Sequence, residues 1–499
     1  MPPSIRPLPE HVAPTTAAPG ESLLVLSDVH LGSDLNDLTP PEDRIRRARA
    51  VDEDLVRLLR HYREAPAPDG RWRLVVAGDL IDFIGMTVRV EGEALSTPPN
   101  EDEQQYGLGN AEDHARAKLR HVAARHVDVF AAMAEFVGHG HALTLVHGNH
   151  DLELHWDGVK DELREILRGH AEAAGLHDAA FDARVAFQPW FFYVDGVAYI
   201  EHGHQYDAYC ATDHVMAPNS PLDPRRIMRG FSEVLLRRVV RPTRGMREHG
   251  HEAFGLFDYV AMGMRLGFGG MWRLLVRFVG AVLELLRLRR EHFVEAAAAL
   301  REEHERRVAL LAEATRIGAD RLRALAALQT PPITRSIRGI LGSVLIDRMA
   351  LGLLCTLALV VAGAVAARHG NHTWMLPASI VVGWVLAHRQ LTRARQIDPT
   401  DALAERAAHL AKLFPVAFVV MGHTHIPAQA KVAGSSTTYI NVGAWAEEEP
   451  DDPSHVWRAP RTHLVIRRGE DGPVADLLAW DTEAAEPRRF VGPDGTGRG

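Results

Sequence analysis

Short apolar runs recur along the chain, and each ends at a group of polar residues. Five runs rich in Val, Leu and Ile have the length of β-strands: 23–26, 73–77, 142–146, 197–201 and 417–421. Residues 44–63 and 111–137 place apolar residues three or four apart with charges between them, as amphipathic helices do. Alternating strands and helices predict a layered α/β fold, which the later runs at 437–442, 463–466 and 475–480 would close.

The segment 208–398 breaks this alternation and predicts a mostly α-helical insert. Residues 349–367 carry no charged side chain and would span about 28 Å as a helix, close to the hydrocarbon thickness of a bilayer. A second uncharged run, 373–387, follows after a short turn. We therefore expect a transmembrane hairpin over 349–387. The alternative is a buried helical hairpin in the core of a soluble cap.

Arginines surround the predicted hairpin. Three precede it and three follow it: Arg335, Arg338, Arg348, Arg389, Arg393 and Arg395. The positive-inside rule then predicts a cell-membrane protein with both flanks, and the α/β domain, on the cytoplasmic side. Further upstream, residues 225–247 contain eight arginines and a single acidic residue, Glu233. These arginines either face anionic headgroups or form a solvated helix face. Residues 87–110, which are polar and acidic, are expected to form a solvated surface loop.

Length and composition permit several domains. The chain has 499 residues and a formal net charge of −9, which gives no sign of nucleic-acid binding. Cys210 and Cys355 are too few for a disulfide framework and fit a reducing compartment. We expect a disordered tail without a signal peptide at 1–20 and a second disordered tail at 485–499. The α/β domain is predicted in two parts, 21–207 and 399–484.

Histidine and aspartate gather where the strand-like runs end. Five motifs follow one another along the chain: Ser27-Asp28-Val29-His30, Gly78-Asp79-Leu80-Ile81-Asp82, Gly148-Asn149-His150-Asp151, His202-Gly203-His204 and Gly422-His423-Thr424-His425. Ligands of α/β folds gather beyond the carboxyl ends of the strands. Two divalent cations about 3.5–4 Å apart, sharing one carboxylate, need such carboxylate, amide and imidazole ligands to clamp a phosphoryl group. The motifs therefore predict a two-metal site. Gly138-His139-Gly140-His141 precedes its strand and is expected to be a surface turn.

The ordered motifs resemble those of calcineurin-like metallophosphoesterases: Asp-x-His, Gly-Asp-x-x-Asp, Gly-Asn-His-Asp/Glu, a lone His and Gly-His-x-His. The resemblance covers 20–207 and 400–482 and leaves out the insert. It implies an α-β-β-α sandwich, two divalent metal ions and hydrolysis of a phosphomonoester, phosphodiester or diphosphate by a metal-bound hydroxide. Nitrogen and oxygen ligands suit Mn²⁺, our preferred ion, and also Fe, Zn or Co.

The resemblance also implies a role for each motif residue. One metal would be bound by Asp28, His30, Asp79 and His425, and the other by Asp79, Asn149, His202 and His423. His150 would face the phosphoryl group, stabilise its charge and protonate the leaving oxygen. Asp151, which we count with His150 as a catalytic candidate, and Asp82 would orient histidines. His204 is the alternative to His202 as a ligand.

Departures from the family pattern bear on the substrate. Phe83-Ile84 stands where protein Ser/Thr phosphatases of this superfamily have Arg-Gly, which argues against a protein phosphatase. The opening Ser-Asp-x-His-Leu, Gly-Asp-Leu-x-Asp and Gly-His-Thr-His-x-Pro resemble UDP-diacylglucosamine pyrophosphatases, although those have Arg in place of His150. With the predicted hairpin, this favours a membrane-proximal, lipid-linked phosphoester. The alternative from another class is a metallated but inactive scaffold that presents the insert.

Overall fold

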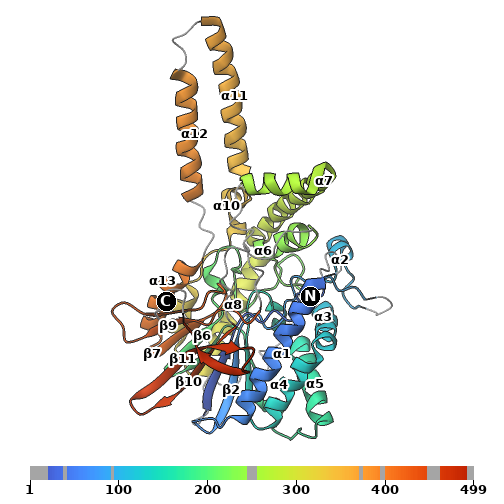
Figure 1. The fold of residues 1–499 in the computed structure, drawn as a ribbon, viewed down its shortest axis with the longest axis vertical. Coiled ribbons are helices and arrows are strands. Elements are labelled where there is room, and N and C mark those ends of the chain that lie inside the picture. Colours follow the sequence, from blue (N-terminus) through green and yellow to red (C-terminus); the bar gives the residue numbers. More distant parts are fainter. Residues whose placement is uncertain are drawn as a thin grey trace.

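The fold is built from two mixed β-sheets and helices that pack against them (Figure 1). The computed structural model describes residues 21–36, 42–90, 95–243, 256–344, 346–369, 375–393, 399–446 and 461–491, which contain thirteen α-helices. This arrangement confirms the predicted α/β class. The tail predicted at 1–20, and residues 492–499 of the second tail, lie outside the described residues.

The larger sheet has seven strands in the order β12-β11-β10-β1-β2-β3-β4. Four of them run parallel: β1 (Glu21–Leu26), β2 (Arg71–Ala77), β3 (Ala142–Val146) and β4 (Val185–Gln188). The other three join antiparallel: β10 (Thr462–Gly469), β11 (Gly472–Asp481) and β12 (Glu486–Arg489). The prediction of disorder from Ala485 onward was wrong for β12, because its backbone pairs with β11 although its composition is polar.

The smaller sheet has five strands in the order β5-β6-β7-β9-β8. They are β5 (Phe191–Val194), β6 (Gly196–Glu201), β7 (Val416–Met421), β8 (Ala428–Lys431) and β9 (Thr438–Asn441). β6 pairs in parallel with β7, with Ile200 opposite Val420, although the whole insert separates them in the sequence. This pairing brings the fourth and fifth motifs to the same edge of one sheet.

One apolar core lies between the sheets and two others lie under the helices. Val25 and Val75 of the larger sheet share a buried cluster with Ile200 and Val420 of the smaller one. Four helices pack on the other face of the larger sheet: α1 (Glu42–Glu64), α3 (Glu112–Arg125), α4 (Val127–Gly138) and α5 (Asp157–Ala173). Three pack on the other face of the smaller sheet: α8 (Ala296–Thr315), α9 (Ala319–Ala326) and α13 (Thr400–Leu413).

The insert is mostly helical, as predicted, but it is not a separate body. Besides α8 and α9 it contains α6 (Phe231–Leu235), a π-helical turn (Leu236–Val240), α7 (Leu256–Leu288), α10 (Ile337–Ser343), α11 (Ile346–His369) and α12 (Met375–Arg393). Since α8 and α9 cover the smaller sheet, part of the insert completes the body of the protein. α7 changes direction at Gly267, whose φ of 68° is not helical.

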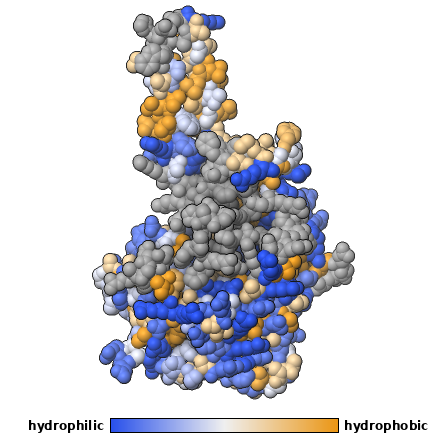
Figure 2. Space-filling model, in the orientation of Figure 1, coloured by the Kyte–Doolittle hydropathy of each residue, from blue (hydrophilic) through white to orange (hydrophobic). Residues whose placement is uncertain are grey.

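The hairpin of α11 and α12 projects from the body (Figure 1). Arg348 at its base donates a hydrogen bond to the carbonyl of Leu391, at 2.7 Å, which ties the two helices together. Apolar side chains along it are exposed, Leu353 to 71% and Leu386 to 61%, and Figure 2 shows the apolar surface gathered there. These residues therefore do not form the buried core of a cap within the described chain.

Two described helical segments are long and apolar enough to cross a membrane. Ile346–Val365 in α11 lies in the predicted hairpin, whereas Met264–Phe293, which begins in α7, was not predicted as a span. The predicted second run, 373–387, lies in α12 except for residues 373 and 374, which are outside the described residues. α12 packs along α11.

The acidic loop and the arginine-rich segment bind each other. The loop contains a short helix, α2 (Glu101–Tyr106), whose Asp102 and Glu103 form ion pairs with Arg226, Arg229 and Arg238, at 2.6–2.8 Å. These arginines therefore neither face headgroups nor form a solvated face, and the loop is not simply solvated. These ion pairs instead hold the insert against the first part of the α/β domain. Each partner neutralises a charge that would be costly to bury alone. Arg244, Arg247 and residues 91–94 of the loop lie outside the described residues.

Candidate metal centre

Every predicted ligand follows a parallel strand. β1 leads to Asp28 and His30, β2 to Asp79, β3 to Asn149, β6 to His202, and β7 to His423 and His425. Strands that run in the same direction end at the same edge, so the motifs converge there although they are far apart in the sequence.

Asp28, His30 and His425 form the first group. Asp28 Oδ1 lies 3.1 Å from His425 Nε2 and 3.8 Å from His30 Nε2, and the two Nε2 atoms lie 3.4 Å apart. Asp28 Oδ1 is fully buried, and no described residue donates a hydrogen bond of good geometry to it. A buried carboxylate oxygen that faces two imidazole nitrogens fits a bound divalent cation.

Asp79, Asn149 and His202 form the second group. His202 Nε2 lies 3.3 Å from Asp79 Oδ2 and 3.1 Å from Asn149 Oδ1. His202 Nδ1 donates to the carbonyl of Ala77, at 2.9 Å, which leaves Nε2 to act as a ligand. Both ring nitrogens of the alternative, His204, are buried without a hydrogen-bond partner among the described residues. His202 is therefore the residue of this motif that joins the group.

Asp79 lies between the two groups. Its Oδ2 is 3.3 Å from His202 Nε2 and 3.9 Å from His30 Nε2, while its Oδ1 accepts the backbone N–H of His150 at 2.8 Å. The carboxylate of Asp79 thus lies between the two ligand groups, in the position that a carboxylate shared by two cations would occupy.

His423 is placed differently from its predicted role. Its ring is 5.2 Å from that of His202, but its Nε2 is 3.1 Å from Asp207 Oδ2. Asp207, Cys210 and His423 together form a group close enough to share one cation. Sequence reasoning missed Asp207 because it belongs to no motif. Its one signal was its position five residues after His202.

His150 is held beside the first group. Its Nδ1 lies 2.8 Å from Asp82 Oδ1, and its ring packs edge-on against that of His30 with centroids 4.6 Å apart. Burial lowers the pKa of His150, but the carboxylates of Asp79 and Asp82 outweigh burial and raise it to about 9. Without cations, His150 therefore carries a proton at neutral pH.

Asp151 has a contact that differs from the predicted one. Its two carboxylate oxygens accept hydrogen bonds from the backbone N–H groups of Gly148 and Leu80, at 2.6 and 2.8 Å. It therefore fixes the loops of the second and third motifs to each other and does not orient a histidine. Burial and the charge of Asp79 raise the pKa of Asp151 to about 7.

The backbone at the site is strained. Seven non-glycine residues in the described chain have a positive φ, and five of them are predicted ligands with φ between 52° and 70°: Asp28, His30, Asp79, His423 and His425. Such conformations are uncommon for residues other than glycine, although Asp and His adopt them more often than most, and they cost about 1–3 kcal/mol each. Their concentration at one edge indicates a functional site, because ordinary turns place glycine at such positions.

Two motif glycines allow the close approach of the ligands. A Cβ at Gly78 would overlap the ring of His202, and a Cβ at Gly148 would overlap the carboxylate of Asp79. The motifs therefore need glycine before Asp79 and before Asn149, since a larger residue would push the second group apart.

Charge compensation also fits divalent cations. Burial raises the pKa of Asp28, but the neighbouring His425 and His202 more than offset this and leave it below its ordinary value. Burial lowers the pKa of His202, while Asp79 and Asp28 raise it to about 9. In the absence of a cation, a proton on His202 thus offsets part of the charge of the two buried carboxylates, whereas burial and the neighbouring His150 lower the pKa of His30 to about 4. A divalent cation at the His202 nitrogen would replace that proton.

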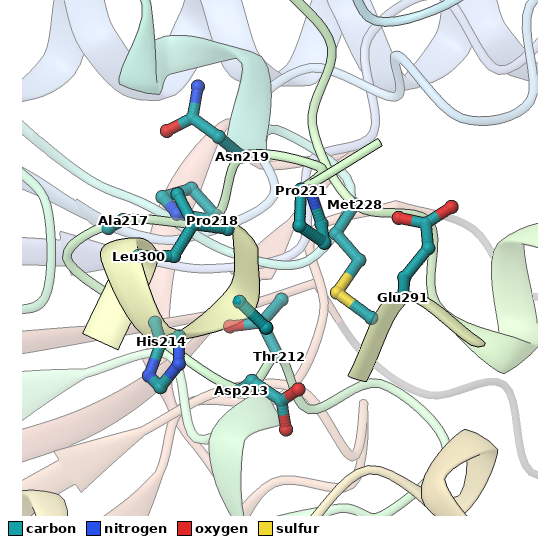
Figure 3. Close-up of a pocket in the computed structure, with 11 residues that line it drawn as sticks. Thr212, Asp213, His214, Ala217, Pro218, Asn219, Pro221, Met228, Glu291 and Leu300 are labelled. Carbon is teal, nitrogen blue, oxygen red and sulfur yellow. The ribbon is translucent and has the colours of Figure 1, made fainter. Parts of the chain in front are cut away.

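Two other features lie apart from this site. The look-alike motif places His139 on the surface, while His141 Nδ1 accepts the backbone N–H of Trp72 at the opposite end of the sheet. A small pocket within the insert, lined by Asp213, His214 and Glu291, encloses about 10 Å³ and has room for one water molecule at most (Figure 3). Neither feature contains a predicted ligand.

In comparisons with known proteins, the chain matches no protein-family model and no curated protein. The residues and their geometry are therefore what bears on its function.

Proposed function

We propose that this chain is a dinuclear metal-dependent phosphoesterase that hydrolyses a phosphomonoester, phosphodiester or diphosphate. The observation that carries the proposal is Asp79, whose Oδ2 lies within 3.9 Å of both His30 Nε2 and His202 Nε2. One carboxylate thus serves two groups of ligands. The nitrogen and oxygen donors suit Mn²⁺, Fe, Zn or Co.

The layering supports the same proposal. Helices, larger sheet, smaller sheet and helices pack in that order, with a shared core between the sheets. This order agrees with the α-β-β-α arrangement that the resemblance to calcineurin-like metallophosphoesterases implies, and so it supports the proposal. All five motifs lie at one end of the two sheets.

In this proposal, different residues bind the cations and donate the proton. Two divalent cations would supply positive charge for the phosphoryl oxygens and a nucleophile derived from water at neutral pH. One cation would be bound by Asp28, His30 and His425. The other would be bound by Asn149 and His202, and Asp79 would bind both cations. Asp82 binds His150 Nδ1, which leaves Nε2 of that ring to donate a proton to the leaving oxygen.

The hydrolase proposal is tested with purified, Mn²⁺-loaded full-length protein. We expect hydrolysis of p-nitrophenyl phosphate, bis-p-nitrophenyl phosphate or a lipid-linked diphosphate, loss of activity with a chelator, and its return when Mn²⁺ is restored. Protein that binds two cations but hydrolyses none of these substrates would instead support the inactive scaffold.

We also propose that the hairpin crosses the membrane and that α7 lies along its surface. α7 lies next to the base of the hairpin (Figure 1), and it exposes Phe268 to 85% and Trp272 to 61%. Its other face carries Glu284, which is buried and paired with Arg229 and Arg238 of the body. A helix held to the body by buried ion pairs does not cross a bilayer, whereas an apolar face of this kind binds the interface. By the positive-inside rule, the arginines that flank the hairpin favour a catalytic domain on the cytoplasmic side.

A cell fractionation tests the membrane proposal. The intact chain is expected in the membrane fraction and should need detergent for release, whereas a variant lacking 349–387 should become soluble. The deletion should keep its metal content, because the hairpin contacts the body only near its base. An intact chain that is soluble without detergent would exclude the transmembrane hairpin.

The position of the insert favours a substrate near the membrane. Arg241 of the insert contacts Asp82 beside His150, so the insert adjoins the same edge of the sheets as the ligands. A lipid-linked phosphoester at the bilayer surface would thus lie near the site. A diphosphate of the UDP-diacylglucosamine type is one candidate, although His150 stands where those enzymes have arginine.

A further inference from the structure

Arg241 reaches from the insert into the candidate site. It directly follows the π-helical turn and is buried. One terminal nitrogen donates to Asp82 Oδ2, at 2.6 Å, and the other donates to the carbonyl of Ser33, at 2.8 Å. The guanidinium therefore holds both a carboxylate at the end of the second motif and the loop that follows the first one.

Asp82 transmits this contact to His150. Its Oδ2 accepts from Arg241, while its Oδ1 faces His150 Nδ1 at 2.8 Å. A carboxylate held by a buried guanidinium on one oxygen has little freedom to turn, so the imidazole on its other oxygen is fixed as well. Gly85 permits the contact, since a Cβ there would overlap the guanidinium.

The other side of Arg241 is attached to α7. Arg277 of α7 donates to the carbonyl of Pro242, at 2.6 Å, and Val240 shares a buried apolar cluster with Leu285 of α7. A continuous path of contacts thus runs from the proposed membrane-surface helix through Arg241 and Asp82 to His150.

We propose that Arg241 is a positioning residue through which docking of the insert holds His150 in its working orientation. The inference rests on the proposed function and deepens it: hydrolysis requires the insert to be docked on the site. Arg241 contacts Asp82 and the carbonyl of Ser33, so we assign its effect on hydrolysis to the orientation of His150 through Asp82. An insert displaced from the body would leave Asp82 without its charged partner and His150 without a fixed orientation.

Arg241→Met tests this, with Arg237→Met as the matched control. Arg237 is a buried arginine of the same turn, but it donates to the carbonyls of Gly107 and Leu108 and not to the site. In full-length protein loaded with Mn²⁺, Arg241→Met should lower kcat about 10–100-fold, as loss of an outer partner of a metal site does. KM and two bound cations per chain should be retained. Arg237→Met should reduce thermal stability and keep kcat.

Two further variants separate positioning from general damage. Arg241→Lys should recover part of kcat, since an ammonium can pair with Asp82 but cannot also reach Ser33 as a planar fork does. If Arg241 acts through His150, Arg241→Met should cause no further loss in a His150→Asn background. Unchanged kcat in Arg241→Met, or losses that multiply in the double variant, would overturn the inference. Wild-type protein that hydrolyses no phosphoester would overturn the proposed function itself.

Discussion

Asp79→Asn should remove most of the bound metal and lower phosphoesterase activity by more than about 100-fold, beyond what loss of an outer partner costs. Asp79 Oδ1 accepts the N–H of His150, and Oδ2 faces His30 and His202. A carboxamide of the same shape has one oxygen, so its amino group would face either the N–H or the nitrogen ligands. In either orientation the shared ligand loses its negative charge at both cation positions, while its volume stays the same.

Metal per chain, measured by elemental analysis after removal of loose ions, is the primary readout, with hydrolysis of bis-p-nitrophenyl phosphate as the second. Asp476→Asn is the control, because Asp476 of β11 pairs with Arg467 of β10 and belongs to none of the motifs. Two cations per chain in Asp79→Asn would refute the assignment of Asp79 as the shared ligand.

His150→Asn should lower the rate without the loss of metal that is expected for Asp79→Asn. We expect kcat to fall about 10²–10⁴-fold, the usual contribution of a positioned general acid, with metal content and KM close to those of the wild type. The side chain of His150 contacts Asp82 and packs against His30, and its backbone N–H donates to Asp79. Since His150 is not one of the assigned ligands, the ligand groups should survive its replacement.

The pH profile gives a second readout for His150. As a proton donor, His150 acts only when protonated, so the kcat of the wild type should fall as pH rises through the pKa of this imidazole. Without cations that pKa is about 9, and bound cations would lower it. The basic limb should therefore lie below pH 9 and be absent in His150→Asn. His139→Asn, at the exposed look-alike motif, should change neither the rate nor the profile.

The ligand positions could be predicted because each depends on a local pattern. An apolar run predicts a strand, parallel strands end at a common edge, and the polar residues that follow must then meet. This reasoning was enough to bring Asp28, His30, Asp79, Asn149, His202 and His425 to one edge, whereas their assignment to two cations came from the resemblance to metallophosphoesterases. The same reasoning identified the apolar stretch that forms α11.

Contacts between segments that are distant in the sequence could not be predicted from local sequence patterns. Arg241 and Asp82 are far apart in the sequence, and neither residue's local pattern specifies the other. The ion pairs of α2 with the arginine-rich segment were missed for the same reason, as was the packing of α8 and α9 on the smaller sheet. Periodicity shows that a helix has an apolar face, but not which surface covers it. Even for His423, a motif residue, the proximity of Asp207 came only from the fold.

Parallel pairing of β6 with β7 ties completion of the site to the order of biosynthesis. A ribosome that has just made β6 must still synthesise residues 202–415, including the hairpin, before β7 exists to pair with it. His425, and with it the group of Asp28, His30 and His425, is therefore synthesised only after the hairpin. Under the proposed function, a nascent chain would thus stay inactive until the hairpin has been made and has met the membrane.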